Sequence, residues 1–450
     1  MLARYTRPAF LDHWSELNKK RTWLEVELAF LAARVETGGL SAEAYDAIKK
    51  NAKLNLERMD AFEADVKHDM IAFVKDVQES LKEAGVGQYA SEVHKYLTSY
   101  DIEDPAMVLL LKRAIHMDIG ALEKLEDALR AQARKHKWTL MIHRTHGQFA
   151  EPGTFGHLLL VFAESVKRSE ARLWLVMQKE LSEGKISGAV GNYPGMDPEL
   201  EAIALQRLEL KPTDAETQIL QRDRFAAVIS AVALASATIE QISRTFWEMM
   251  RSDVGELQEP RGKKQRGSSR MAYKKNPITI EQLQGLPRLL RSHLVAAMEN
   301  VATPECRDIS QSSVERHIFP DATALLDYMA DKLTKIVQDL VVFPGRMQEN
   351  FERTYGVWAA QPIRDALMET GISYDEAYDY LQSCGFEAIE KRTSLLNVVS
   401  EVVISKAVVL TAKDVLGIDR LRSFFDARAY IEKGTEHIFR NEKESDGSSH

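Results

Sequence analysis

The stretch that decides the fold is "RFAAVISAVALASATIEQISRTFWEMMRSDV", residues 224–254. It contains no glycine or proline, and Ala, Val, Ile and Leu lie on nearly every side of its first half, which is typical of a helix inside a bundle. A helix of this length spans roughly 45 Å, so more than one subunit could share it. Its small residues would let neighbouring helices approach closely; they are Ala226, Ala227, Ala231, Ala233, Ala235 and Ala237.

The rest of the chain indicates helices as well. Glycine and proline number 23 and 13 among 450 residues, and they fall between long segments of helical periodicity. Further long helices are expected at 109–138, 154–182, 278–301 and 320–341. We therefore predict an all-α fold.

Two or three domains, or one long architecture with appended ends, are expected, because 450 residues exceed what one hydrophobic core usually serves. We predict a helical domain at 1–98, a bundle of long helices at 99–346, and a second helical domain at 347–450. The last ten residues, "NEKESDGSSH", are polar, and we expect them to be disordered.

The composition predicts a soluble cytoplasmic protein. The formal net charge of -8 is spread over many segments, which argues against a general nucleic-acid or membrane surface. Cys306 and Cys384 are too few and too far apart to form a disulfide framework or a metal-ligand set, as suits a reducing compartment. The first residues lack the apolar core of a signal peptide. A helix that spans a membrane needs about 18 uninterrupted apolar residues, and no run in the sequence is that long.

One segment, residues 261–277, differs from this acidic background. Seven of its first fifteen residues are Lys or Arg, and it ends in an Asn-Pro pair. Asn276 could cap a helix whose first position is Pro277, so that unpaired N–H groups would face the loop and attract anions. Ser268 and Lys274 would add a hydroxyl and a cation. A flexible basic surface loop would have the same composition.

Three other stretches carry groups suited to acid-base chemistry. In "HRTHGQFAEPGTFG" (143–156), His146 precedes a probable helix. His68 lies in "VKHDM", and His94 lies in "EVHKYLTSYD". Each histidine alone is more often structural, but together with an anion-binding loop they suggest acid-base catalysis on an anionic substrate near neutral pH.

These stretches carry a family resemblance. "KHD", "LTSYD", "RTHGQFAEP", "ISGAVGNY", "TQILQRDR", "GSSRMAYKKNP" and "RDISQSSVER" occur in this order. The chain resembles the adenylosuccinate lyase family of the fumarase and aspartase superfamily over about residues 1–385. The resemblance implies three helical domains and a homotetramer whose core is a bundle of long helices from all four chains, with active sites shared between subunits. It also implies small-molecule substrates, no nucleic-acid or membrane partner, and no metal or organic cofactor.

The resemblance also implies a reaction. The family cleaves a C–N bond and releases fumarate, from adenylosuccinate to give AMP and from succinylaminoimidazole carboxamide ribotide (SAICAR) to give the free carboxamide ribotide (AICAR). By similarity, Ser268 is the base and His146 is the general acid. Four further residues match catalytic positions, namely His68, which supports His146 or contacts phosphate, Lys274 and Asn276, which hold the substrate carboxylate, and Glu281, which orients Lys274 or His146.

A larger set matches positions that bind the substrate. Arginine is expected where a phosphate needs forked donors, and hydroxyl groups are expected around the succinyl carboxylates. The matching residues are Arg4, Tyr5, Lys67, His94, Thr98, Ser99, Thr145, Gln218, Ser269, Met271, Arg307, Ser312 and Arg316.

The chain departs from the family pattern around the expected nucleotide pocket. Lys67 stands where arginine is usual, Ala272 replaces a proline, and Pro304, Glu305 and Cys306 replace Trp-His-Glu. The elimination chemistry is therefore a safer prediction than the base specificity. Two alternatives stay open: a related lyase acting on argininosuccinate, a carboxymuconate or another succinyl-amine, and a non-catalytic scaffold or RNA-binding protein using residues 261–275.

Overall fold

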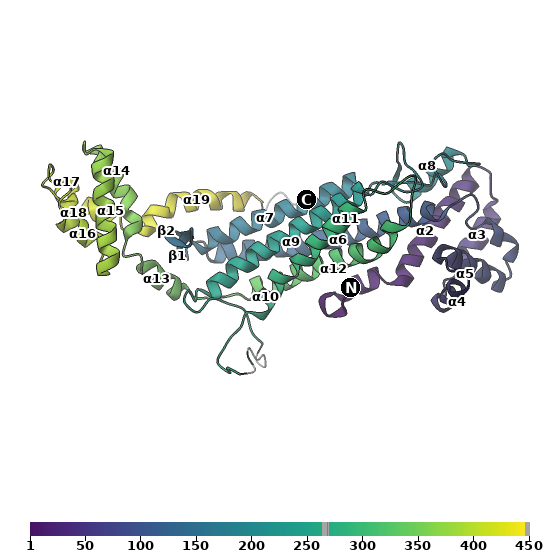
Figure 1. The fold of residues 1–450 in the computed structure, drawn as a ribbon, viewed down its shortest axis with the longest axis horizontal. Helices are drawn as coiled ribbons and strands as arrows, with labels where there is room; N and C mark the ends of the chain where they lie inside the picture. Colours follow the sequence, from purple (N-terminus) through teal and green to yellow (C-terminus); the bar gives the residue numbers. More distant parts are fainter. Residues whose placement is uncertain (263–267, 269, 446–450) are drawn as a thin grey trace. The chain divides into compact units, whose positions relative to one another are not determined.

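The protein is mostly helical, as predicted (Figure 1). The computed structural model describes residues 1–262, 268 and 270–445. Six short strands in three two-stranded sheets accompany the helices in this part of the chain. The all-α prediction is thus confirmed, with a small amount of β-structure that the helical periodicity did not reveal.

The chain divides into two compact units according to its internal contacts. Unit 1 comprises residues 1–125, 165–243 and 282–333, and unit 2 comprises residues 126–164, 244–281 and 334–450. The long helices contribute residues to both units; they are α6 (Ser99–Lys135), α7 (Phe155–Lys179), α9 (Asp223–Met250) and α12 (Ser310–Gln338). The expected division into domains at 1–98, 99–346 and 347–450 stays a prediction.

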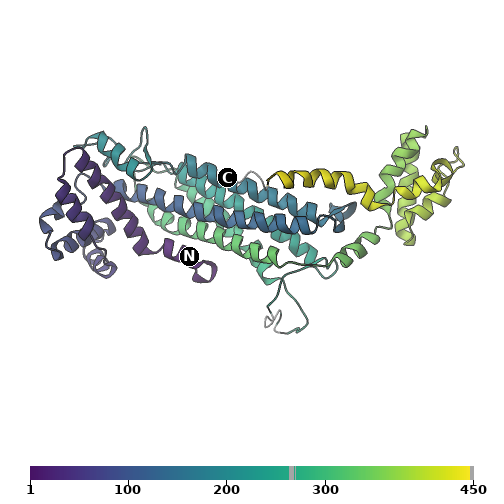
Figure 2. The ribbon, with the colours of Figure 1, turned by 180° about the vertical axis from the view of Figure 1, so that it is seen from behind.

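Unit 1 contains the N-terminal helices and most of the long helices. Its segments of α6, α9 and α12 run side by side (Figures 1 and 2). Its other elements are η1 (Ala3–Tyr5), α1 (Pro8–His13), α2 (Glu16–Glu36), α3 (Ala42–Asn51), α4 (Leu56–Val66), α5 (Asp69–Glu83), η2 (Gly87–Glu92), β3 (Glu183–Gly184), α8 (Pro198–Arg207), β4 (Lys211–Pro212) and α11 (Pro287–Glu299).

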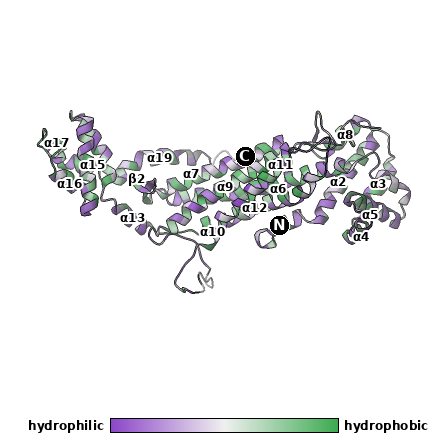
Figure 3. Ribbon diagram, viewed as in Figure 1, coloured by the Kyte–Doolittle hydropathy of each residue, from purple (hydrophilic) through white to green (hydrophobic). Residues whose placement is uncertain are grey.

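Helix α9 is the apolar helix that the opening stretch predicted. Val228, Ile229, Val232 and Ile239 are fully buried, and Figure 3 shows hydrophobic residues along the long helices. By length and composition α9 could also cross a membrane, but 61% of its most apolar window is buried inside the protein. This burial favours a core helix of a soluble protein.

Three predicted helix boundaries were wrong, each because of a proline. The segment 278–301 forms two helices, α10 (Ile278–Gly285) and α11, because Pro287 lacks the N–H that would continue the first one. In contrast, α6 and α12 begin at residues 99 and 310, well before the expected 109 and 320, and run through Pro105 and Pro320. The missing hydrogen bonds are offset by burial of neighbouring side chains, which include Ile102, Ala106, Phe319 and Ala322.

Unit 2 contains a β-hairpin and the C-terminal helices. Its core includes Trp358, Ile363, Leu381, Leu395 and Val399. Its elements, besides parts of the long helices and the start of α10, are β1 (Leu140–Thr145), β2 (Gln148–Thr154), β5 (Leu257–Gln258), β6 (Val341–Val342), α13 (Pro344–Glu352), η3 (Val357–Ala359), α14 (Ala360–Glu369), α15 (Tyr374–Lys391), α16 (Leu395–Glu401), α17 (Ala412–Leu416), α18 (Ile418–Ser423) and α19 (Ala427–Ser445).

The expected disordered tail is helical in its first half. Helix α19 continues to Ser445, so residues 441–445 extend it instead of leaving the fold. The polar composition misled the prediction, because polar residues such as Glu442 and Lys443 are also good helix formers. The remaining residues, 446–450, lie outside the described part of the chain.

Candidate active site

Six of the predicted site residues line one pocket of unit 1. The pocket has a volume of about 210 Å³. The six are Lys67, His68, Ser99, Arg307, Ser312 and Arg316, and the wall is completed by Glu63, Asp69, Glu103 and Ile309. Motifs that lie up to about 250 residues apart in the sequence are therefore brought to one place in the fold.

Three helices begin at this pocket. Asp69 and Ser99 are the first residues of α5 and α6, and Ser312 lies in the first turn of α12. Lys67 ends α4 in the left-handed conformation, with φ of 54°, and the extended residue His68 then starts α5. Because the N-terminal end of a helix carries partial positive charge, three such ends favour an anion in the pocket.

The charges in the pocket are already partly paired. Arg316 Nη2 lies 2.5 Å from Asp69 Oδ2 and 4.0 Å from Glu103 Oε2. Burial opposes ionisation of Asp69, but the hydrogen bond and charge of Arg316 outweigh it and lower the pKa of Asp69. Arg316 therefore reaches the pocket already paired with a carboxylate.

Arg307 is held by two other contacts. Its Nη1 donates to Gln218 Oε1 at 3.0 Å, and its guanidinium lies 4.0 Å from the ring centroid of Tyr100. Gln218 Nε2 in turn donates to the carbonyl of Ala189 at 3.0 Å. The predicted ligands Arg307 and Gln218 are thus brought together, and Gln218 positions Arg307.

His94 and Thr98 do not line the pocket. His94 Nδ1 is 2.6 Å from Oε1 of the buried Glu27, and although burial lowers the pKa of His94, this carboxylate raises it overall. The backbone N–H of Thr98 donates to Asp101 Oδ2 at 2.9 Å. Both residues therefore brace the chain that enters α6.

A buried ion pair anchors the same segment. Lys185 Nζ lies 2.6 Å from Asp101 Oδ1, and both side chains have no exposed surface. The same carboxylate oxygen accepts the backbone N–H groups of Ser187 and Gly188, each at 3.1 Å. The motifs "LTSYD" and "ISGAVGNY" thus form one structural unit.

Arg4 and Tyr5 lie elsewhere in unit 1. They belong to η1, where the Tyr5 ring packs edge-on against Tyr328 of α12, with the ring centroids 5.6 Å apart. Neither residue lines the pocket of Lys67 and His68.

Two residues of the unit 1 pocket, Asp69 and Glu103, were not predicted from the sequence. Asp69 stood in the quoted "KHD" motif, whereas Glu103 gave no signal because the helix was expected to begin only at residue 109.

His146 occupies the tip of the β-hairpin in unit 2. In the β1–β2 pair, Thr145 faces Gln148, and His146 and Gly147 between them have φ of 54° and 75°. Such positive angles at both central residues are typical of the tight turns of two-residue hairpins. The expectation that His146 would precede a helix directly was wrong, because a seven-residue strand separates it from α7. Both Thr145 and His146 are exposed.

The segment 261–277, called the signature loop from here on, contributes to a second pocket, of about 620 Å³, in unit 2. Lys274, Asn276 and Glu281 line it, together with Trp247, whose indole N–H lies 3.4 Å from Glu281 Oε1. Ser268 Oγ accepts the backbone N–H groups of Met271 at 3.0 Å and Arg270 at 3.3 Å. Met271 is exposed, and Ser269 lies outside the described residues.

The prediction that the helix after the loop presents unpaired N–H groups is wrong for Thr279 and Ile280. The buried carboxylate of Glu259 accepts the backbone N–H groups of Thr279 at 3.1 Å and Ile280 at 3.2 Å. A carboxylate of the chain itself therefore occupies the N-terminus of α10, so an anion bound by the loop would have to be held by its side chains.

A second buried carboxylate ties the hairpin to the segment before the loop. Glu256 Oε1 accepts a hydrogen bond from Asn350 Nδ2 at 2.8 Å and lies 3.4 Å from Arg144 Nη2. Arg144 is two residues before His146 on β1. Neither Glu256 nor Glu259 stood out in the sequence, because nothing local reveals what a lone glutamate will contact.

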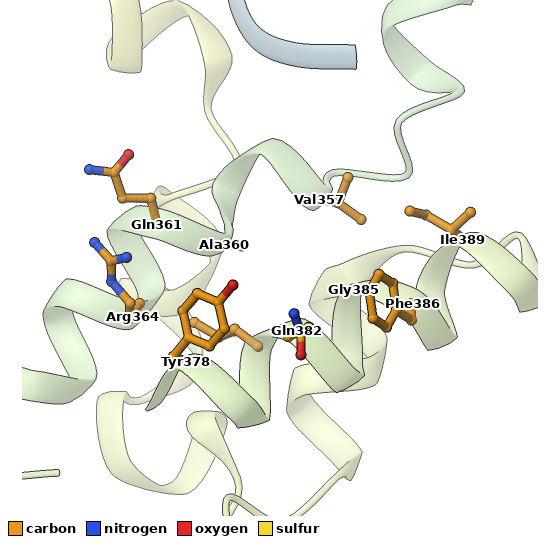
Figure 4. A pocket seen from close by; sticks show the side chains of 10 residues that line it. Val357, Ala360, Gln361, Arg364, Tyr378, Gln382, Gly385, Phe386 and Ile389 are labelled. Atoms are coloured by element: carbon orange, nitrogen blue, oxygen red, sulfur yellow. The ribbon is translucent and has the colours of Figure 1, made fainter. Parts of the chain in front are cut away.

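A third pocket contains none of the predicted residues. It has a volume of about 330 Å³ and lies between α14 and α15, where Arg364 lies beside Tyr378 (Figure 4). Its wall is largely apolar and includes Val357, Phe386 and Ile389. Among the described residues, no group of three or more His, Cys, Asp or Glu side chains is arranged to hold a metal ion.

The chain is similar to several known proteins. The model of a lyase family matches residues 3–288. Adenylosuccinate lyases from Synechocystis sp. and Bacillus subtilis are 42% and 39% identical to the chain over 86% and 87% of its length, and 89% and 90% of theirs. The adenylosuccinate lyase of Thermotoga maritima is 38% identical and covers 99% of this chain and 100% of its own.

The fold also matches solved structures. Fumarate lyase from Mesorhizobium sp. BNC1 superposes with a TM-score of 0.86 at 23% identity, covering 98% of this chain and 99% of its own. A 3-carboxy-cis,cis-muconate lactonizing enzyme from Pseudomonas putida gives 0.82 at 24% identity, covering 97% and 98%. These two likenesses establish the fold, and the more similar relatives establish the family. The chain belongs to the adenylosuccinate lyases, a family of C–N lyases within the fumarase and aspartase superfamily.

Proposed function

We propose that the protein eliminates fumarate from adenylosuccinate, giving AMP, and from SAICAR, giving AICAR, in purine biosynthesis. The observation that carries this proposal is the 36–42% identity to five adenylosuccinate lyases over most of the chain. The pocket of unit 1 supports it, because it suits the phosphate that both substrates share.

The phosphate subsite is the proposed role of the unit 1 pocket. Lys67, Arg307 and Arg316 supply three cations to its wall, and the two guanidinium groups offer forked donors for phosphate oxygens. The start of α5, of α6 and of α12 adds partial positive charge. His68 and Ser312 add shorter polar contacts in the same wall.

The reaction needs a base on one side of the succinyl group and an acid on the other. Ser268 Oγ takes the proton from the carbon beside a carboxylate, the electron pair of that C–H bond forms the double bond of fumarate, and the C–N bond breaks. His146 then donates a proton to the departing nitrogen. No net oxidation occurs, so the elimination needs no redox partner.

Serine is a weak base unless its alkoxide is stabilised. The two backbone N–H groups that reach Ser268 Oγ, from Arg270 and Met271, support this role because hydrogen bonds to the charged form favour ionisation. Lys274 and Asn276 hold the succinyl carboxylate and the charge that develops on it, which is an oxyanion-type contribution. Glu281 orients Lys274, with which it shares a pocket wall.

The remaining predicted residues take supporting roles. Arg307 and Gln218 bind the nucleotide as a pair, consistent with their 3.0 Å hydrogen bond. The other proposed substrate contacts are Arg4, Tyr5, His94, Thr98, Ser99, Thr145, Ser269 and Met271. Those residues that do not line the unit 1 pocket would act in sites completed by other subunits.

We also propose a cytoplasmic homotetramer with active sites shared between subunits. Unit 1 exposes large apolar side chains on α7, α9 and α11, which a single chain leaves in contact with water. These residues are Trp174 and Leu175 on α7, Leu234 on α9, and Leu289, Val295 and Met298 on α11. Burying them between subunits would remove this exposure.

Fumarate release tests the function directly. Purified protein is mixed with adenylosuccinate, with SAICAR and with argininosuccinate, and fumarate is followed by absorbance. We expect turnover of the first two substrates and none of the third. Absence of turnover of both purine substrates by protein shown to be tetrameric would refute the proposal and favour a different succinyl-amine.

A further inference from the structure

Glu103 lies where two cavities of unit 1 meet. It lines the 210 Å³ pocket together with Lys67, Arg307 and Arg316, and it also lines a smaller cavity of about 30 Å³ beside it. Its side chain is only 15% exposed. A carboxylate in this position faces the place where a phosphate would enter.

Glu103 competes with Asp69 for one cation. The same atom, Arg316 Nη2, lies 2.5 Å from Asp69 Oδ2 and 4.0 Å from Glu103 Oε2. Asp69 holds the hydrogen bond, so it stays ionised, and its negative charge faces Glu103. Two carboxylates that share one cation cannot both ionise freely.

The other charged groups around Glu103 do not return its pKa to the ordinary value of a glutamate. They come from every helix that packs around the two cavities and from the loop before α12. These groups are Glu63 and Lys67 at the end of α4, Lys19 on α2, Asp69 on α5, Asp104 on α6, Arg222 at the start of α9, Arg307 before α12, and Glu315 and Arg316 on α12, with the titratable side chains of His68 and Tyr100. Burial, followed by the charge of Asp69, raises the pKa of Glu103 to about 7.

We propose that Glu103 takes up a proton from solvent when the phosphate group of a ligand enters this pocket, so that ligand binding is coupled to proton uptake. The proposal rests on the proposed function for the assignment of phosphate to the pocket. A phosphate brings up to two further negative charges beside Glu103, and neutralising the carboxyl removes the repulsion. The protonated carboxyl can then donate a hydrogen bond, while Arg316 pairs with the phosphate.

Calorimetry of AMP binding measures this uptake. AMP is titrated into the full-length protein at pH 7.0 in two buffers of different ionisation enthalpy, and the difference in heat gives the number of protons taken up. If the pKa of Glu103 rises by one unit on binding from a value near neutrality, roughly 0.4 proton is taken up per AMP at this pH. Glu103→Gln removes the titrating group and should lose that uptake while still binding AMP.

Glu63→Gln is the matched control, because it removes an exposed carboxylate from the same pocket wall. We expect it to keep the uptake of the wild-type protein. If Glu103→Gln takes up as many protons as the wild type, or if both variants lose the same amount, the role of Glu103 is wrong, although the proposed function stands. If the wild-type protein does not bind AMP, the phosphate assignment fails together with the inference.

A second variant keeps the test decisive if Glu103→Gln does not fold. Asp69→Asn removes the competing charge and leaves Arg316 to Glu103, so the ionised form of Glu103 is stabilised. The pH at which proton uptake is largest should then move downward relative to the wild type. An unchanged pH dependence would overturn the competition between Asp69 and Glu103.

Discussion

Glu259 Oε2 lies 3.2 Å from the backbone nitrogen of Ile280. A side chain that precedes the signature loop therefore caps the N-terminus of the helix that follows the loop. The two residues are 21 positions apart and bracket Ser268, Lys274 and Asn276. The base of the loop is thus held at both ends by one carboxylate, while the catalytic candidates lie between.

Replacing Glu259 by alanine should therefore affect both stability and turnover. Loss of a helix cap costs about 0.5–2 kcal/mol of unfolding free energy. Lys274 and Asn276 would also be less firmly positioned, because the start of α10 next to them would no longer be fixed. We expect a lower denaturant midpoint and a lower kcat for fumarate release. Glu248→Ala, an exposed glutamate on α9 that is 55% accessible, should change neither; an equal loss in both variants would contradict the capping role.

Ser268→Ala and His146→Ala should each reduce turnover by orders of magnitude while the oligomer persists. The first removes the proposed base, and the second removes the proposed acid from the hairpin tip. Turnover is measured as fumarate release, and the assembly is followed by light scattering. Ser313→Ala, at an exposed serine on α12, is the control and should retain activity. Near-wild-type turnover of either variant would refute its assigned role.

Lys185→Met should lower the free energy of unfolding by about 3–5 kcal/mol, because it leaves the buried carboxylate of Asp101 without its cation. Chemical denaturation measures this difference. Lys82→Met, which breaks the exposed pair with Glu79, is expected to cost at most about 0.5 kcal/mol. A small effect at Lys185 would mean that the backbone N–H groups of Ser187 and Gly188 suffice for Asp101.

Asp118→Asn should stabilise the protein increasingly as the pH rises. Burial raises the pKa of Asp118 well above its ordinary value, and Asp327 adds a second carboxyl whose pKa burial raises to about 6. The folded state therefore holds protons that the unfolded chain has already lost, so wild-type stability falls as the pH rises from about 4 through the folded pKa values. Asparagine carries no charge and removes the contribution of Asp118 to that fall.

Thermal unfolding of Asp118→Asn and the wild type at several pH values gives the measurement. The difference in Tm should be small at about pH 4 and largest above pH 7. Asp127→Asn, at an exposed position of the same helix, provides the matched control and should show no such trend. A constant difference across this range would exclude titration of Asp118 as the cause.

Leu234→Glu tests the proposed assembly. Leu234 of α9 is 52% exposed, and a charge at a subunit contact should shift the protein to smaller species and reduce turnover. Leu2→Glu, at a 70% exposed position near the N-terminus, should leave the assembly intact. A tetramer that survives Leu234→Glu would place this part of α9 outside the interface.

The local chemistry of this protein can be read from its sequence. The apolar run of α9 predicts a core helix, because periodicity within thirty residues depends only on neighbours along one helix. The order of the motifs predicts the family. It also predicts Lys67, His68, Arg307 and Arg316 as site residues, since side-chain type decides what a residue can bind.

Tertiary structure decides which of these groups meet. Packing of α5, α6 and α12 gathers the four residues into one pocket and adds Glu103, which no local pattern revealed. Glu259 at the start of α10 and Glu256 beside Arg144 depend likewise on chain segments that approach only in the fold. The physical reason is that hydrogen bonds and charges act through space, whereas sequence patterns record only what lies nearby along the chain.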